Sequence, residues 1–120
     1  MTKLRVLSLS TLYPHDQAPN FGVFVERQMQ AVMQRGDVDL VLISPQGIPP
    51  FPLGLHPRYA ALKDLPAVEL RGGVQVLRPR FTLIPGIGAR LNAGAEARAV
   101  LPLAKRLHAE APFDLIDAQF

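Results

Sequence analysis

The sequence predicts an α/β domain: an open, mostly parallel sheet with helices on both faces and an inserted β-hairpin. Two apolar runs of strand length, within residues 4–10 and 38–44, enclose a helix-like segment at 23–35. Uninterrupted apolar runs are typical of strands that are buried on both faces of a parallel sheet. A strand, a helix and a second strand in succession form a βαβ unit, and further strand and helix patterns follow it.

The first βαβ unit spans residues 4–44. Asn20 is the expected N-cap of its helix, and Gly36 is the expected stop at the other end. The apolar side chains of this helix fall on or near one stripe, which predicts the face that packs on the sheet: Phe24, Val25, Met29, Val32 and Met33.

Prolines exclude regular structure through most of residues 45–66, and a second loop is expected at 79–88. Between these loops, residues 67–70 and 74–78 flank Arg71-Gly72-Gly73, which predicts a hairpin. A helical region follows from about 89 to 111, and its apolar side is formed by Leu91, Val100, Leu103 and Leu107. Pro102 predicts a kink or a restart within it. Residues 114–118 are the last predicted strand.

Composition limits the class of protein. The chain has 120 residues, enough for one domain, and its 48% apolar content excludes disorder. Without cysteine, neither disulfides nor thiolate chemistry is available. No apolar run approaches the roughly 20 residues of a membrane span, which favours a cytoplasmic location. Seven of the basic residues lie between 71 and 108 against one acid, Glu96. This segment is either a solvated face or a contact for an acidic ligand or anionic lipid, including peripheral contact with the inner membrane surface. No nucleic-acid motif is present, so nucleic acid is not an expected partner.

The loop between the first strand and the first helix is the first candidate site. Asn20-Phe21-Gly22 leads into a helix start, whose free N–H groups and partial positive charge favour phosphate. Glycine also lets a ligand come close to the main chain, although Gly22 can equally serve only to begin the helix. His15 and Asp16 lie in the same loop and are candidates for ligand contact. The three histidines, at 15, 56 and 108, show no metal-ligand spacing, so no metal site is predicted.

Five segments in order and spacing resemble the N-terminal domain of family 4 glycosyltransferases: residues 6–14, 20–25, 41–45, 73–80 and 113–120. The resemblance implies a GT-B architecture, in which two Rossmann-like domains face each other across a cleft. It also implies sugar transfer from a nucleotide-sugar with retention of configuration, and neither a bound metal nor a tightly bound cofactor. Residues 1–120 would then be a truncated N-terminal domain that lacks its C-terminal partner domain and is inactive alone.

The resemblance also implies roles for individual residues. Gln119 matches the place of a histidine near the sugar in many relatives, and Asp117 lies on the same face of the strand. Both are therefore candidate catalytic residues, although a glutamine does not titrate and cannot act as a base. Asn20, Phe21 and Gly22 occupy the place of the donor-contacting loop. This chain departs there from the two adjacent glycines of many relatives.

The partners that this implies are a nucleotide-sugar donor, used as a substrate, and a saccharide or lipid acceptor in polysaccharide or glycolipid biosynthesis. His15 and Asp16 are candidates for contact with this acceptor. The last strand ends with the chain, so an open sheet edge is expected to cause self-association. Two other classes remain open. Leu115-Ile116-Asp117 has a superficial likeness to the phosphoacceptor strand of a receiver domain, and a generic nucleotide-binding module fits the same pattern.

Overall fold

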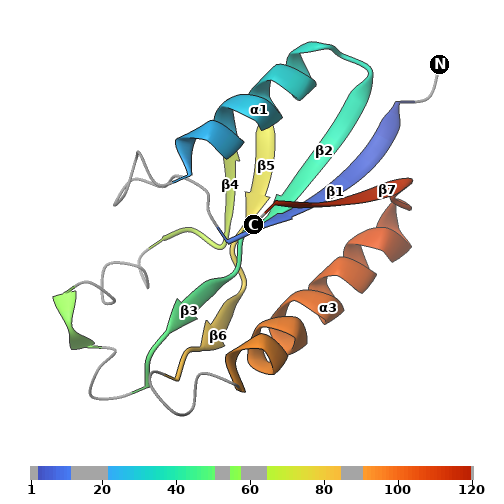
Figure 1. Ribbon diagram of the computed structural model, residues 1–120. Coiled ribbons are helices and arrows are strands. Elements are labelled where there is room, and N and C mark those ends of the chain that lie inside the picture. The colour runs from blue at the N-terminus through green and yellow to red at the C-terminus, as the bar shows by residue number, and fades with distance from the viewer. Residues whose placement is uncertain (1–2, 12–21, 51–54, 58–64, 85–90, 120) are drawn as a thin grey trace.

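The computed structural model describes residues 3–11, 22–50, 55–57, 65–84 and 91–119 (Figure 1). Its main sheet contains, in spatial order, β4 (Val68–Arg71), β5 (Val74–Leu77), β2 (Val38–Ile43), β1 (Leu4–Ser10) and β7 (Leu115–Gln119). Pairing is parallel throughout except between β4 and β5, which are antiparallel. The mostly parallel α/β sheet predicted from the sequence is therefore confirmed.

The order of the parallel strands identifies the kind of α/β sheet. Taken in chain order, the four parallel strands β1, β2, β5 and β7 lie in space as third, second, first, fourth. This is the Rossmann-type order, and its direction reverses between β1 and β7. A receiver domain instead places its third parallel strand beside the first. Because β5 pairs with β2, the sheet does not have the strand order of a receiver domain.

Two helices cover opposite faces of the sheet (Figure 1). From α1 (Val23–Gln34), Val25 and Met29 pack on a cluster of apolar side chains from β1, β2 and β5. From α3 (Asn92–Glu110), Leu107 packs on the other face, against a cluster that includes Val41 and Ile43. The second strand is buried on both faces, as its continuous apolar run predicts.

Two residues assigned to apolar faces lie outside the core. Phe24 and Leu91 are both exposed. Phe24 precedes Val25 by one residue, about 100° around the helix, and therefore points away from the face that Val25 and Met29 share. Leu91 precedes the first residue of α3 and does not join its packed face.

The N-terminal cap of α1 differs from the prediction. The N-cap is Gly22, not Asn20, because the helix begins at Val23. Gly22 has φ 71° and ψ 26°, the left-handed conformation that glycine adopts without steric cost. At the other end the helix stops at Gln34, and Gly36 donates its N–H to the carbonyl of Met33, as expected of a terminating glycine.

The proline-rich segments contain a pair of strands that the sequence does not reveal. β3 (Gln46–Ile48) and β6 (Arg80–Thr82) form a separate two-stranded parallel sheet. β3 fits between Pro45 and Pro49, so its own three residues keep their N–H groups for pairing. The expectation of irregular structure is therefore wrong at 46–48 and at 80–82.

The α3 helix continues through Pro102, so the restart that was one of two expectations does not occur. Proline removes one helix hydrogen bond, the one to the carbonyl of Arg98. Both Arg98 and Pro102 are exposed, so water can hydrate this carbonyl. Within the described residues, no helix is long and apolar enough to cross a membrane.

Arg5 connects several elements at the end of the sheet where the parallel strands begin. Its Nη1 lies 2.6 Å from Oδ2 of Asp39 in β2, and its Nε donates to the carbonyl of Ala111, after α3, at 2.8 Å. Its backbone N–H donates to Asp114 just before β7, and its guanidinium lies 4.7 Å from the ring centre of Phe113. One side chain thus connects β1 to β2, to the end of α3 and to the segment before β7.

β7 forms one edge of the described sheet. Its Leu115 and Ile116 are 54% and 70% exposed, values that contrast with the buried Leu7 beside them on β1. An unpaired strand edge with exposed apolar side chains is a template for pairing with another chain. Self-association through β7 stays a prediction, and the exposed Leu115 and Ile116 favour it.

Candidate functional site

Four polar residues lie side by side at the carboxyl ends of the parallel strands. Ser10 pairs with Gln119 across β1 and β7. The pairs Leu9–Ile43 and Ile43–Leu77 place the next residues, Ser44 and Arg78, in line with Ser10. The N–H of Ser44 donates to the carbonyl of Leu77 at 2.8 Å, so the pairing continues past the end of β2. We call Gln119, Ser10, Ser44 and Arg78 the strand-end row.

The strand-end row lies on the α1 side of the sheet. Side chains alternate along a strand, so residues two apart share a face. Ser44 and Arg78 each come two residues after a member of the α1-side core, Leu42 and Val76, and Ser10 follows Val6 by four. α1 starts at the same edge, because it follows β1 in the chain. The row therefore lies at the carboxyl-end edge of the sheet, where sheets of this type bind ligands.

Three members of the row are buried although they are polar. Ser10, Ser44 and Arg78 are 1%, 0% and 2% exposed. Within the described residues, Oγ of Ser44 has no hydrogen-bond partner. A buried polar group without a partner costs free energy and calls for an explanation, such as a ligand or ordered water. The strand-end row is therefore the first candidate for a binding site in this structure.

Asp117 and Gln119 touch each other, as their shared face on β7 predicts. Nε2 of Gln119 donates to both carboxylate oxygens of Asp117, at 3.0 and 3.3 Å. Oγ of Ser8, the partner of Asp117 in the β1–β7 register, lies 3.3 Å from Oδ2 of the same carboxylate. With its nitrogen engaged, the Gln119 amide presents its oxygen as an acceptor for a ligand hydroxyl. Both side chains are half-buried at the point where the strand order reverses.

Of the remaining predicted site residues, the structure describes only Gly22. Gly22 is the N-cap of α1, and the N–H groups of Val25 and Glu26 donate to its carbonyl, at 2.9 and 3.3 Å. His15, Asp16, Asn20 and Phe21 lie outside the described residues, so their predicted ligand contacts remain predictions.

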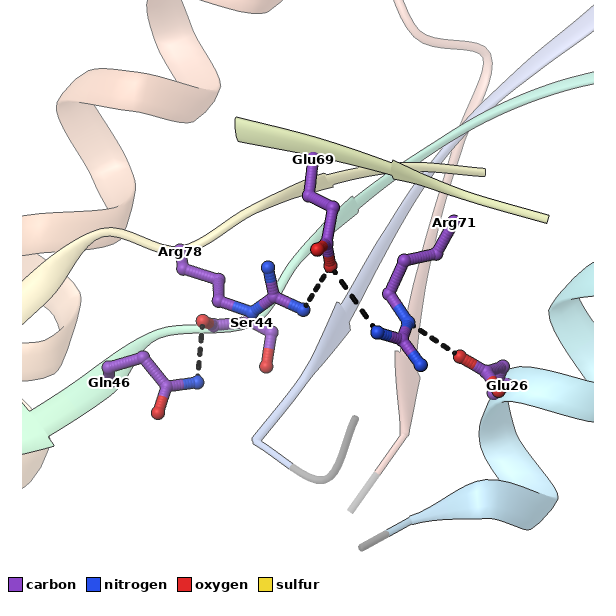
Figure 2. Close-up of polar contacts among 6 residues, drawn as sticks. All are labelled: Glu26, Ser44, Gln46, Glu69, Arg71 and Arg78. Carbon is purple, nitrogen blue, oxygen red and sulfur yellow. Dashed lines mark hydrogen bonds and ion pairs between the residues drawn. The ribbon is translucent and has the colours of Figure 1, made fainter. Parts of the chain in front are cut away.

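Sequence reasoning did not assign a role to Ser10, Ser44 or Arg78. Each is a polar residue at the carboxyl end of a buried apolar run, and that shared position is the signal available in the sequence. Figure 2 shows the surroundings of Ser44 and Arg78: Arg78 contacts Glu69, and Nε2 of Gln46 donates to the carbonyl of Ser44 at 3.4 Å.

An apolar cavity of about 420 Å³ lies on the α3 side of the same strand ends. Leu9, Val100 and Ile116 contribute to its lining, together with Glu96. Burial beside these apolar groups raises the pKa of the Glu96 carboxyl above its ordinary value. With so few polar groups, this cavity suits an apolar group better than a sugar or a phosphate.

The described residues contain no group of three or more His, Cys, Asp or Glu side chains that could hold a metal ion. Nδ1 of His108 accepts the backbone N–H of Phe113, which gives this histidine a local structural contact.

Comparison with known proteins gives one relative. Over 84 residues, 69% of this chain, the sequence is 31% identical to the "Putative teichuronic acid biosynthesis glycosyltransferase TuaC" of Bacillus subtilis (strain 168). The matched part spans 21% of that protein's length. No family model matches the chain, and no solved structure matches it. The chain is therefore similar to one segment of a glycosyltransferase, and this similarity supports a glycosyltransferase fragment.

Proposed function

We propose that this chain is part of the N-terminal, Rossmann-like domain of a retaining family 4 glycosyltransferase with the GT-B architecture. The observation that carries the proposal is the buried polar row at the reversal point of the sheet, in a chain similar to a glycosyltransferase segment. Sheets with this strand order bind nucleotides at that point, and a nucleotide-sugar donor fits its polar lining. The donor is a substrate here, and no tightly bound cofactor is needed.

The proposed roles follow from the chemistry of each group. The Gln119 amide orients a sugar hydroxyl through its oxygen, while the Asp117 carboxylate fixes the amide and accepts hydrogen bonds from hydroxyls. The backbone at Gly22, with Asn20 and Phe21 before it, approaches the donor diphosphate near the start of α1. His15 and Asp16 contact the acceptor.

The name of the relative refers to teichuronic acid biosynthesis. We accordingly propose a saccharide or lipid acceptor in polysaccharide or glycolipid assembly, at the cytoplasmic side of a membrane. A second Rossmann-like domain completes the cleft and supplies most donor contacts. Since transfer needs both substrates held in one closed site, the 120-residue chain by itself should transfer no sugar. Transfer by this chain at ordinary rates, with a panel of nucleotide-sugars and acceptors, would contradict the proposal.

Binding tests the site itself. Titration of the ¹⁵N-labelled chain with UDP-glucose and GDP-mannose should shift the amide signals of Gly22, Asp117 and Gln119 for at least one donor. Gln119→Ala should weaken that binding. Gln75→Ala is the matched control, because Gln75 is an exposed glutamine on β5 and should leave the affinity unchanged. Shifts confined to other parts of the chain, or equal effects of the two variants, would place the ligand elsewhere.

A further inference from the structure

Four charged side chains form a continuous chain of contacts on the α1 side of the sheet (Figure 2). Nε of Arg71 lies 2.9 Å from Oε2 of Glu26, and its Nη1 lies 3.6 Å from Oε1 of Glu69. Nη2 of Arg78 lies 3.0 Å from the same Glu69 oxygen. We call Glu26, Arg71, Glu69 and Arg78 the charge chain. Its signs alternate and its formal charges cancel.

The charge chain joins three parts of the fold that meet at the candidate site. Glu26 belongs to the first turn of α1, and this turn directly follows Gly22. Glu69 and Arg71 belong to β4, the outer strand of the hairpin, and Arg78 is a member of the strand-end row. The hairpin therefore reaches the helix start through Arg71 and the row through Glu69.

The hairpin also comes close to α1 one helical turn further along the helix. Gly72 in the hairpin turn has φ 55°, and a Cβ there would collide with the side chain of Gln30. Glu26 and Gln30 are four residues apart and share one face of α1. The hairpin thus meets this face at two levels, through an ion pair at Glu26 and through the close approach of the Gln30 side chain to Gly72.

Stability alone does not account for the charge chain. The Glu26 and Arg71 side chains are only 14% and 21% exposed, so pairing them required removal of much of their hydration. Ion pairs of this kind often contribute no more than apolar residues of similar volume would, and a role in fixing register is their best-supported use. The apolar contacts of Val25 and Met29 are non-directional, whereas the Arg71 guanidinium holds two carboxylates in a fixed geometry.

We propose that the charge chain is a positioning device, in which Arg71 and Glu69 hold the first turn of α1, and with it Gly22, against the strand-end row. This inference rests on the proposed function only for what the site binds; the positioning itself is a property of this fold. Loss of Arg71 leaves the Glu26 and Glu69 carboxylates without the cation between them and releases the helix start.

Hydrogen exchange tests the positioning without any ligand. Arg71→Gln should speed amide exchange at Val25 and Glu26, whose N–H groups donate to Gly22, by about tenfold. Exchange at Leu40 and Leu42, in the core strand, should stay unchanged and so report intact global stability. Arg71→Lys should restore protection only in part, because an ammonium cannot reproduce the two-nitrogen contact of a guanidinium. Arg35→Gln is the control, since Arg35 pairs with Asp37 in the open at the far end of α1.

Unchanged exchange at Val25 and Glu26 in Arg71→Gln would overturn the proposal, as would equal acceleration at Leu40 and Leu42. A second measurement connects positioning to binding: Arg71→Gln should weaken UDP-glucose affinity about threefold or more, and Arg35→Gln should not. If exchange rises while affinity stays constant, the device does not serve the site. If the unaltered chain binds no nucleotide-sugar, the donor contacts proposed for Gly22, Asp117 and Gln119 fail, and the exchange data still decide the positioning.

Discussion

Substitution of Gly22 gives a graded test of the start of α1. Gly22 has φ 71° and ψ 26°, and in this left-handed conformation a residue with a Cβ lowers the free energy of unfolding by about 1–2 kcal/mol. Alanine should therefore cost about 1 kcal/mol, and valine, which is β-branched, about 2 kcal/mol or more. Asparagine enters this region several-fold more readily and should cost less than alanine. All three variants should remain folded, since domains are stable by about 5–15 kcal/mol.

Urea unfolding measures this order directly. The midpoint should fall from glycine through asparagine and alanine to valine, with a constant slope against urea concentration. A valine variant as stable as the unaltered chain would refute the strain argument, and so would an asparagine variant less stable than valine.

The same series separates strain from ligand approach. Gly22→Asn keeps most of the stability but adds a side chain where backbone is proposed to meet the donor. It should therefore lose UDP-glucose affinity out of proportion to its stability. Full affinity in Gly22→Asn would mean that Gly22 serves only to begin the helix.

Three further predictions concern the rest of the domain. Leu42→Ala removes a fully buried side chain from the central strand and should cost about 2–5 kcal/mol in urea unfolding, whereas an effect below about 1 kcal/mol would contradict the described core. The chain should self-associate through β7, and Ile116→Lys should shift it toward monomer in sedimentation over a concentration series; a monomer at all concentrations before substitution would contradict an open edge. Because the folded-state pKa of Glu96 is raised, its carboxyl should lower stability progressively as pH rises above its ordinary pKa. We therefore compare the free energies of unfolding of Glu96→Gln and the unaltered chain. The variant should be more favoured at pH 7 than at pH 4, and an equal difference at both pH values would exclude the raised pKa of Glu96 as the cause.

Local patterns in the sequence were sufficient for the elements whose signals are local. The apolar runs gave β1 and β2, and Gly72-Gly73 marked the β4–β5 turn, where both glycines have positive φ. The period of two along β7 correctly placed Asp117 and Gln119 on one face, and the structure shows them in contact. Each of these inferences needs only neighbours in the chain.

What the sequence did not reveal depends on pairing between distant segments. β3 and β6 pair at Gln46 and Arg80, and neither three-residue strand carries a local signal strong enough to outweigh the prolines nearby. The strand-end row exists only because the registers of four strands bring their ends level, so Ser44 and Arg78 looked like ordinary strand ends. Electrostatic partners such as Arg71 and Glu26 are 45 residues apart and follow from the tertiary fold.

The contacts of Arg5 also define an order of events for a chain emerging from the ribosome. Its partner Asp39 is 34 residues away, within the first βαβ unit, but Ala111 and Asp114 are 106 and 109 residues away. β1 can therefore pair with β2 early, whereas its other edge can pair only once β7 has been synthesised. Closing a loop of more than 100 residues costs roughly 4 kcal/mol of chain entropy, which β1–β7 pairing must offset. β7 should therefore dock on β1 later than β2 does, and until then one edge of β1 remains exposed to chaperones and to neighbouring nascent chains.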